Sequence, residues 1–474
     1  MAARNRNLLI ALVALGLALR GYHYLRGSSV WQDEAGVLVN VLSKSWGGLL
    51  GRLSLCQAAP PLFLWLEKAV ALTLGDGPYA FRLPSFLASC AAMVLLAWAA
   101  GRLLAPRAAA WAVLLFAVSE QLSWHACETK PYSFDVLTAT VLLALYTATR
   151  NQSAGRRLLC FAMTAPVLIF LSYPAIFLYG GVLAALAPAV WREKRASGWA
   201  AYGLLAVVAA GSFLILLLGP IHAQHEPALD AYWVNDFAPW DRPWYMPVWT
   251  LLSTLEVGRY CCKPLGQVLV PLAFFGTVVL WRRGQRGVAV LLATPILLAL
   301  AGAFLHRYPY GGDRIMVYAA PAIVLLIGAG TAAAWEWLGR CHRLAPAALV
   351  LLFLPPVYAA AKAVVFPWPT ADFAGAAAYV EARRLPTDVV AGNDWTDLYY
   401  FRRLGSAYHG EAVADAPGRC WIVFSNGDRA ADGRLKPAHD MGPAGWVAVD
   451  RREFAFTTVL LLERPEAKMA SGGR

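Results

Sequence analysis

Charged residues are scarce in this chain. Only 15% of its 474 residues are Asp, Glu, Lys or Arg, whereas 59% are hydrophobic. Soluble proteins usually carry about a quarter charged residues. Runs such as "LLIALVALGLAL" and "GLLAVVAAGSFLILLLG" approach or reach the roughly 20 apolar residues that cross a bilayer. The composition therefore excludes a soluble enzyme and predicts a mostly α, polytopic helical membrane protein.

The sequence also lacks the common signatures of nucleotide and metal binding. No glycine-rich phosphate-binding loop is present, and the eight cysteines show no metal-ligand spacing. His222 and His225 are too loosely placed to predict a metal site. No small-residue cleavage site follows the first apolar run, which is therefore expected to remain as a span. The net charge of +12 follows the loops and does not predict nucleic-acid binding.

Lys and Arg gather in one set of connections between the apolar runs. We predict about eleven spans, which begin near Leu8, Phe86, Ala108, Phe134, Leu158, Ala175, Trp199, Leu265, Val288, Ile315 and Ala345. The short basic connections are "MAARNR", "GRLLAPR", "RNQSAGRR", "WREKRASG", "WRRGQRG" and "GRCHR". The positive-inside rule assigns them, and the N-terminus, to the cytoplasm. If the two short runs around "LSYPA" form one bent span, the orientation downstream inverts.

An odd number of spans places the C-terminus outside. From about Phe366 the composition changes, and "DVVAG", "RCWIVFS" and "FTTVLLLE" have strand lengths and patterns. We therefore predict a membrane domain at 1–365 and a small extracytoplasmic α/β domain at 366–474. Five cysteines lie in predicted outward segments, where a disulfide can form: Cys56, Cys127, Cys261, Cys262 and Cys420. The sequence leaves their pairing open.

The outward connections are rich in acids, aromatics, Pro and Gly, which places the working site on the outer face. The first connection, "VWQDEAG", sets Asp33 and Glu34 side by side. Apolar residues at helical spacing follow and predict an amphipathic interfacial helix, or a loop helix that covers the bundle. The Pro pair in "QAAPP" begins a second short helix, so that interfacial helices occupy about 35–75.

The second outward connection, "HACETKPYSFD", crowds charges at the predicted membrane edge. Pro131 disfavours helical geometry at Lys130, which can turn the ammonium group toward a cavity. For Glu128 and Lys130 we favour a functional role, because charges at this depth tend to face cavities. For Asp135 we favour a side chain that reaches water at a helix end.

The third outward connection is "HRYPYGGDR". Its Gly311–Gly312 pair permits a close backbone approach, and Arg314 suits a phosphate oxygen at headgroup depth. Tyr308 and its neighbours can also serve as interfacial anchors. A further outward loop runs from His222 to about Pro264, and its stretch "HAQHEPALDAYWVNDFAPWDRPWYMPVW" places aromatics beside carboxylates. This pattern fits sugar stacking and an aromatic belt equally well.

These residue types suggest one chemistry. A carboxylate can act as a general base toward a hydroxyl acceptor. Cations can hold the phosphate of a lipid carrier and stabilise it as it leaves. A lipid-linked substrate also explains why catalysis would need so many spans.

Four segments, in this order and on one predicted face, resemble the GT-C superfamily of lipid-linked-sugar glycosyltransferases. They are "WQDEAGVLVNV", "QAAPPLFLWLEKAVALTLGDGPYAFRLPSFLA", "ETKPYSFDVLTA" and "YPYGGDRIMVYAAP". The resemblance is to the protein O-mannosyltransferase-like (family 39) and aminoarabinose-transferase branch. It covers the spans from end to end but not the C-terminal domain.

The resemblance implies an inverting transferase that uses a polyprenyl-phosphate sugar. It implies that Asp33 deprotonates the acceptor, with Glu34 as its partner. The role of Glu34 stays open: it can tune its neighbour, bind the acceptor or a metal ion, or cap the interfacial helix that begins at Ala35. Glu128 stands where a second acid positions the acceptor or, in some branches, a divalent metal ion. No other cofactor is expected.

Lys130 and Arg314 match positions expected to face the carrier phosphate. Several relatives carry His or Lys beside the first Pro pair, but "QAAPP" has no cation there. The contact with the carrier phosphate is therefore expected to depend more on Lys130 and Arg314. Further candidate substrate-binding residues are Tyr132, His306, Tyr308 and Asp313.

A transporter or lipid flippase is the main alternative, and a non-catalytic scaffold is a third. A transporter predicts acids near the membrane midplane and repeat-like halves, whereas the charges here lie at the predicted outer edge. A scaffold does not explain the clustered acids and Lys130. We therefore predict a plasma (inner) membrane glycosyltransferase of the cell envelope that acts on an external protein, lipid or polysaccharide.

Overall fold

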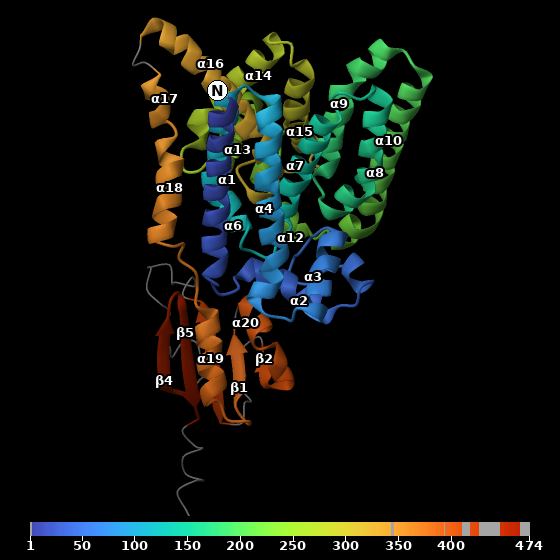
Figure 1. Cartoon of the computed structure of the whole chain (residues 1–474). Coiled ribbons are helices and arrows are strands. Elements are labelled where there is room, and N and C mark those ends of the chain that lie inside the picture. The colour runs from blue at the N-terminus through green and yellow to red at the C-terminus, as the bar shows by residue number, and fades with distance from the viewer. Residues whose placement is uncertain (1, 343–345, 393, 410–417, 426–445, 465–474) are drawn as a thin grey trace, which may run out of the picture. The chain divides into compact units, whose positions relative to one another are not determined.

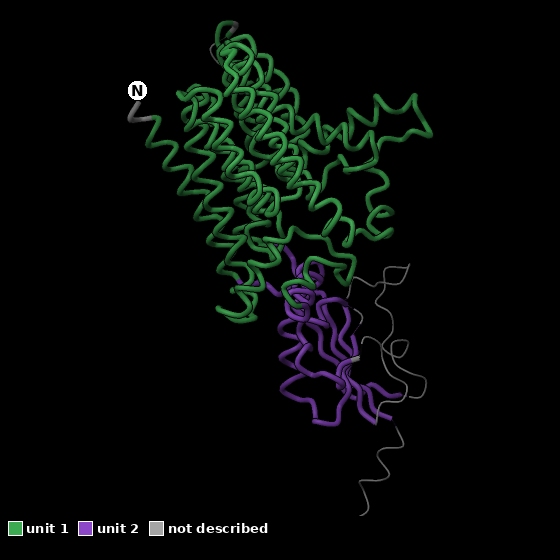
Figure 2. The backbone as a smooth tube through the Cα atoms, turned by 90° about the vertical axis from the view of Figure 1, so that its right-hand side faces the viewer, with its two compact units in different colours: residues 1–26, 45–367 green, residues 27–44, 368–474 purple. Residues whose placement is uncertain are grey.

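The computed structural model describes residues 2–342, 346–392, 394–409, 418–425 and 446–464 (Figure 1). The chain divides into two compact units (Figure 2). Unit 1 comprises Met1–Arg26 and Ser45–Pro367, and unit 2 comprises Gly27–Lys44 and Trp368–Arg474. Unit 1 is helical and unit 2 contains a small sheet. The predicted fold class, a polytopic helical protein with a small C-terminal α/β domain, is confirmed.

A helix, or for the last span a helix pair, matches each predicted span. They are α1 (Ala2–Leu25), α4 (Pro78–Leu103), α5 (Pro106–Val118), α7 (Tyr132–Ala148), α8 (Ala154–Leu171), α9 (Ala175–Glu193), α10 (Ala196–Leu216), α14 (Gly266–Arg282), α15 (Arg286–Phe304), α16 (Ala320–Cys341), and α17 (Ala347–Leu351) with α18 (Leu354–Val365). Among the described residues, 8 helical segments are long and apolar enough to cross a membrane, or up to 9 if a bent pair counts as one span. The helices α5 and α7 are apolar but shorter.

The two apolar runs on either side of "LSYPA" form separate helices. Each of α8 and α9 is by itself long and apolar enough to span a membrane. The bent pair lies elsewhere, where α13 (Met246–Cys261) meets α14 at an angle of 104°. The sequence predicts a loop from His222 to about Pro264, and α13 lies within this range. That expectation was wrong, because α13 is a regular helix of 16 residues.

Glycines bring the central helices of unit 1 close together. A Cβ atom added at Gly276 of α14 would lie 1.9 Å from the carbonyl oxygen of Leu326 in α16. One added at Gly330 of α16 would lie 1.9 Å from the carbonyl oxygen of Leu272. Only residues without a side chain permit such backbone contact, which is a common way to pack helices in membranes.

Short elements connect the long helices. They are α2 (Gln32–Ser43), η1 (Gly48–Leu50), α3 (Pro61–Thr73), α6 (Glu120–His125), η2 (Leu217–Ile221), α11 (His222–Gln224), α12 (Pro227–Tyr232), η3 (Val234–Asp236), η4 (Pro243–Tyr245) and η5 (Arg314–Ala319). The second interfacial helix begins at Pro61, as the Pro pair predicts. The first begins at Gln32, three residues earlier than expected, so that both acids of "VWQDEAG" lie in its first turn.

Unit 2 is built on a five-stranded sheet with the order β2-β1-β3-β5-β4. Its elements are α19 (Phe373–Arg383), β1 (Val389–Gly392), α20 (Trp395–Tyr400), η6 (Arg402–Ala407), β2 (Tyr408–His409), β3 (Arg419–Ser425), β4 (Val447–Phe454) and β5 (Thr457–Glu463). The strand β1 pairs in parallel with β2 and β3, whereas β5 is antiparallel to β3 and β4. Apolar residues of α19 pack on one face of β3 and β5.

Residues 27–44 belong to unit 2 and not to the helical unit in which the sequence analysis placed them. The Ser29 hydroxyl donates to Asp372 at 3.3 Å, and the Val30 amide donates to the Tyr400 hydroxyl at 2.9 Å. The helix α2 packs against α20. These contacts tie the segment after α1 to the C-terminal domain.

Candidate active site

The break between α5 and α6 positions the residues of the second outward connection. Ser119 ends α5, and its hydroxyl caps α6 by accepting from the Leu122 amide at 3.4 Å. The fully buried guanidinium of Arg20 in α1 donates to the Phe116 carbonyl at 3.2 Å. The end of a helix leaves such carbonyls without a partner. Arg20 thus stabilises the point at which α5 stops and α6 begins.

His125 at the end of α6 joins two side chains. Its Nδ1 contacts the Glu128 carboxylate, and its Nε2 lies 2.7 Å from the Tyr260 hydroxyl of α13. The Trp124 indole donates to the second Glu128 oxygen at 3.1 Å. A carboxylate at Nδ1 orients the ring and leaves Nε2 to exchange a proton with a hydroxyl. The group Glu128–His125–Tyr260, hereafter the buried relay, can therefore store or transfer a proton.

Lys130 is buried beside the relay. Its Nζ donates to Gln57 Oε1 at 2.7 Å, and its carbonyl accepts from Ser85 at 3.2 Å. A buried ammonium requires polar partners because the loss of hydration is costly. Gln57 is the first residue of "QAAPP", so the segment that lacks a cation of its own binds the cation of Lys130 through an amide oxygen.

An apolar groove of about 500 Å³ begins at Ala58, the chain neighbour of Gln57. Side chains of α9, α10 and α15 form its walls, and its polar residues are Gln224, His225, Arg307 and Tyr308. Tyr173 links the parts of the edge at Ala58, since its hydroxyl lies 2.9 Å from the Ala59 carbonyl oxygen and 3.0 Å from Gln224 Oε1. The segment 57–59 is thus shared by the Lys130 contact and the groove.

The third outward connection folds against the loop that precedes α13. The His306 Nε2 lies 2.8 Å from the Ala238 carbonyl, and its ring stacks on Phe237. A Cβ at Gly311 would lie 1.8 Å from an Asp236 carboxylate oxygen, and one at Gly312 would lie 2.9 Å from the Glu256 backbone. The close approach predicted for the Gly pair is confirmed.

Asp236 and Asp313 are the carboxylates of this contact. Burial, and secondarily the nearby Asp313, raise the pKa of Asp236 to about 6. Asp313 accepts from the Arg314 amide and lies 3.9 Å from the Arg314 guanidinium. Arg314 is about three-quarters buried. Its charge is therefore partly compensated within its own connection.

Asp33 and Glu34 lie in unit 2, in the first turn of α2. Acidic residues there stabilise the N-terminal end of a helix. Glu34 is fully buried and accepts from the Trp31 amide at 3.3 Å, so it caps the helix, which is one of the roles the sequence left open. Asp33 is partly exposed.

The structure brings some of the predicted residues together. Glu128, Lys130 and Tyr132 form one group, in which the Tyr132 ring lies 4.8 Å from His125. Tyr308 lies within electrostatic range of Tyr132. The other predicted residues of unit 1 are His306, Asp313 and Arg314, which lie in the third connection, where Asp313 is within electrostatic range of Tyr260.

Sequence reasoning missed His125, Gln57 and Tyr260. His125 precedes Glu128 by three residues, a spacing that places side chains on one helical face, and this signal was available. Tyr260 is 135 residues from His125 and has no local signal. The expectation for Asp135 was wrong, because Asp135 is buried in α7 and not directed to water. Within the described residues, none of the seven cysteines forms a disulfide.

Clusters of His, Cys, Asp and Glu side chains are the usual protein ligands of metal ions. Within the residues that the structure describes, no group of three or more His, Cys, Asp or Glu side chains is placed to hold an ion. Glu128 and His125 contact each other. The divalent ion that the resemblance allows stays a prediction.

Comparison with known proteins gives a family match and a fold match. The family model described as dolichyl-phosphate-mannose-protein mannosyltransferase matches residues 58–216. The crystal structure of ArnT from Cupriavidus metallidurans in the apo state is similar, with a TM-score of 0.55 and 14% identity over 97% of this chain and 98% of that one. ArnT bound to undecaprenyl phosphate gives a TM-score of 0.56 and 15% identity over 95% and 97%.

A more distant likeness is to the oligosaccharyltransferase of Archaeoglobus fulgidus in the apo form. The TM-score is 0.50, with 11% identity over 85% of this chain and 64% of that one. No curated protein matches the chain by sequence. The fold likeness thus extends over nearly the whole chain, and the family match covers the stretch that contains Glu128 and Lys130.

Proposed function

We propose that this chain, a membrane protein of the GT-C superfamily that is similar to protein O-mannosyltransferases and to ArnT, transfers a sugar from a polyprenyl-phosphate donor to an acceptor at the outer face of the membrane. The observation that carries the proposal is the apolar groove, whose edge at residues 57–59 also holds the contact between Gln57 and the buried Lys130. A polyprenyl-phosphate sugar has an apolar tail and a charged head, and this pairing of surfaces suits both.

The donor is proposed to lie with its tail along the groove. Ile176, Phe213 and Leu298 offer an apolar wall, and Arg307 lies among the polar lining residues. A guanidinium binds phosphate by charge-assisted hydrogen bonds. Lys130, and Arg314 in the third connection, are the further cations proposed to face the phosphate and to stabilise the charge that develops as it leaves.

Asp33 is proposed as the general base that deprotonates the acceptor hydroxyl. Its side chain is partly exposed, whereas Glu34 is buried and caps α2. Glu34 is therefore proposed to hold the segment that carries Asp33. Glu128 is proposed to act through His125, because both of its oxygens accept from side chains of its own segment. The substrate-binding roles of Tyr132, His306, Tyr308 and Asp313 remain proposals.

The direct test is a donor panel. Purified full-length protein is incubated with radiolabelled polyprenyl-phosphate sugars, or with the corresponding nucleotide sugars, in the presence of a membrane extract. We expect label to move to an acceptor from at least one polyprenyl-phosphate donor and from no nucleotide sugar. Transfer from nucleotide sugars, or none from any lipid-linked donor, would contradict the proposal.

A further inference from the structure

A second cavity lies between α1, α4 and α5, and nothing in the proposed reaction uses it. Its volume is about 570 Å³. It lies at the end of the helices where α1 begins, α4 ends and α5 begins. This is the end with the basic connections, opposite the proposed catalytic face.

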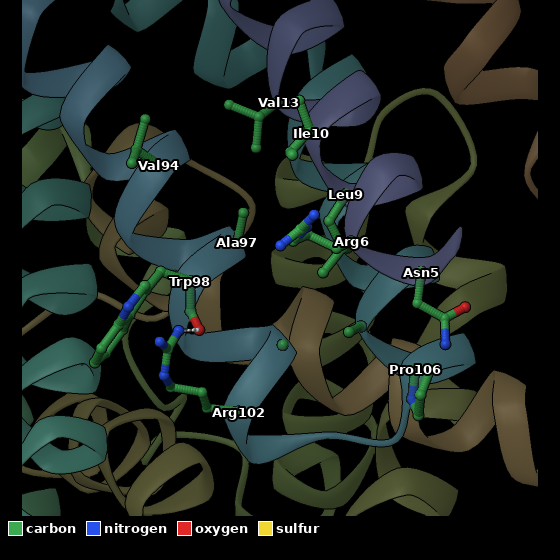
Figure 3. A pocket seen from close by; sticks show the side chains of 12 residues that line it. Asn5, Arg6, Leu9, Ile10, Val13, Val94, Ala97, Trp98, Arg102 and Pro106 are labelled. Carbon is green, nitrogen blue, oxygen red and sulfur yellow. Dashed lines mark hydrogen bonds between the residues drawn. The ribbon is translucent and has the colours of Figure 1, made fainter. Parts of the chain in front are cut away.

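The walls of the cavity are apolar. Leu9, Ile10 and Val13 line it from α1, and Val94 and Ala97 line it from α4 (Figure 3). From Arg6 to Val13 the helix rises about 10 Å. That length suits the first part of an acyl chain lying along the groove between the two helices.

Close helix contacts bound the cavity along this groove. A Cβ atom added at Gly101 of α4 would lie 3.3 Å from the Leu9 side chain of α1. One added at Gly16 of α1 would lie 2.9 Å from the Met93 sulfur of α4. The cavity-lining residues Ile10, Val13, Val94 and Ala97 lie between these two contacts. Two of the side chains beside the opening, Ile10 and Val94, are about half exposed.

The mouth of the cavity is positive. Arg6 of α1 and Arg102 of α4 both line it, and Figure 3 shows the Arg102 guanidinium folded back toward Trp98. The guanidinium carbon of Arg102 lies 4.1 Å from the centre of the Trp98 ring. Within the described residues, no acidic side chain lines the cavity or pairs with Arg6 or Arg102. Arg150 adds a third cation, since it donates to the Arg102 carbonyl at 3.2 Å.

The start of α5 adds to the positive field. Pro106 lines the cavity and occupies the first turn of α5, and Ala105 gives this helix no side-chain cap. The amides of the first turn of a helix carry partial positive charge and attract anions. Together, two guanidinium groups and a helix start line an apolar groove whose edge carries the half-exposed Ile10 and Val94.

We propose that this cavity binds an anionic phospholipid of the surrounding bilayer. The phosphate of the headgroup lies between Arg6 and Arg102, and one acyl chain follows the groove between α1 and α4. Basic pockets between membrane helices bind anionic headgroups in this way. The glycerol ester carbonyls then lie near the Trp98 indole, which favours the interfacial depth. The bound lipid joins α1 to α4 and α5.

The test is a titration of the full-length protein in neutral detergent, with bound lipid counted by native mass spectrometry. The probes are phosphatidylglycerol and phosphatidylcholine with identical acyl chains. Each cation near an anionic headgroup is worth about five-fold in affinity, so Arg6→Gln/Arg102→Gln is expected to weaken phosphatidylglycerol binding by about 25-fold. Wild-type protein is expected to bind phosphatidylcholine at least ten-fold more weakly than phosphatidylglycerol, because the phosphatidylcholine headgroup has no net charge to attract the two arginines.

The matched control is Arg192→Gln/Arg282→Gln, which removes the same charge from exposed positions at the ends of α9 and α14. It is expected to bind phosphatidylglycerol as the wild type does. Val94→Trp fills the groove from a half-exposed position and is expected to weaken binding without a change of charge. Equal loss in the control pair, or equal binding of both lipids, would overturn the proposal. Displacement of phosphatidylglycerol by stoichiometric polyprenyl phosphate would overturn it as well, because the cavity would then belong to the carrier.

Discussion

At the scale of single residues, His125 links two other buried side chains of unit 1. It contacts the Glu128 carboxylate on one side and the Tyr260 hydroxyl on the other, and all three side chains are buried. A buried polar network of this kind is stable only while every member keeps its partner. Changes of charge at Glu128 should therefore be felt at His125 and Tyr260.

The first prediction concerns Glu128→Gln. The substitution keeps the size of the side chain and an oxygen for Trp124, but it removes the charge that orients His125. We expect the rate of sugar transfer to fall by about 100-fold, the size of a typical acid–base contribution, and the pH–rate profile to change shape. Glu336→Gln, at a half-exposed ion pair with Arg283, is the control. A normal rate and profile in Glu128→Gln would contradict the proposed role.

Asp236 gives a pH-dependent prediction. Its pKa is about 6 in the folded protein and about 3.9 in an unfolded chain. The folded state therefore binds the Asp236 proton more tightly than the unfolded chain does. This stabilisation is fully present below about pH 4 and is lost as the pH rises through 6. Because Asp236 is only partly buried, we expect the effect to stay below about 1 kcal/mol.

The corresponding variant is Asp236→Asn, which cannot ionise. Above pH 6 it should unfold at a higher temperature than the wild type, and the difference should vanish toward pH 4. Thermal unfolding in detergent between these limits measures the effect, with Asp241→Asn in the same loop as an exposed control. A difference that does not vary with pH would rule out this explanation.

At the scale of elements, local sequence signals were sufficient for most helices. Long apolar runs gave the spans, and the Pro pair gave the start of α3 at Pro61. The helix α13 was missed because "MPVWTLLSTLEVGRYC" mixes polar and apolar residues among loop-like aromatics. The placement of α2 in unit 2 was missed because it depends on contacts with Asp372 and Tyr400, more than 340 residues away.

The packing of α14 against α16 yields a prediction at this scale. Gly276→Ala places a methyl group against the Leu326 carbonyl, so the two helices must separate. Such overpacking costs about 1–3 kcal/mol and should lower the temperature of unfolding. Gly211→Ala in α10 is the control, because a Cβ there meets no atom within 4 Å. It should leave stability unchanged or raise it slightly, since Ala favours helix. Equal effects of the two variants would contradict the close packing.

The candidate site was predictable from the sequence only in part, because several of its contacts join segments that are far apart in the chain. Glu128, Lys130 and Tyr132 lie within one short stretch, and their proximity follows from the chain itself. The contacts of Lys130 with Gln57 and of His125 with Tyr260 join segments that are 73 and 135 residues apart. No periodicity or motif reports such contacts, so the partner of each charged group came only from the fold.

At the scale of the whole molecule, the distribution of Lys and Arg makes a prediction about orientation. The N-terminus is expected in the cytoplasm and the C-terminus outside, because the basic connections alternate with the others. A tag at the C-terminus should then be cleaved by protease added to intact cells or spheroplasts, whereas a tag at the N-terminus should be protected. The reverse pattern would overturn the proposed orientation and the outer location of the reaction.

The central claim is sugar transfer from a lipid carrier with Asp33 as the base. It is tested most directly by the release of polyprenyl phosphate and the labelling of acceptor by wild-type protein and by Asp33→Asn. We predict turnover by the wild type and a loss of at least 100-fold in Asp33→Asn, in keeping with the loss of a general base, at an unchanged temperature of unfolding. Full turnover by Asp33→Asn would contradict the assignment of the base, and no turnover by the wild type with any lipid-linked sugar would contradict the proposed function itself.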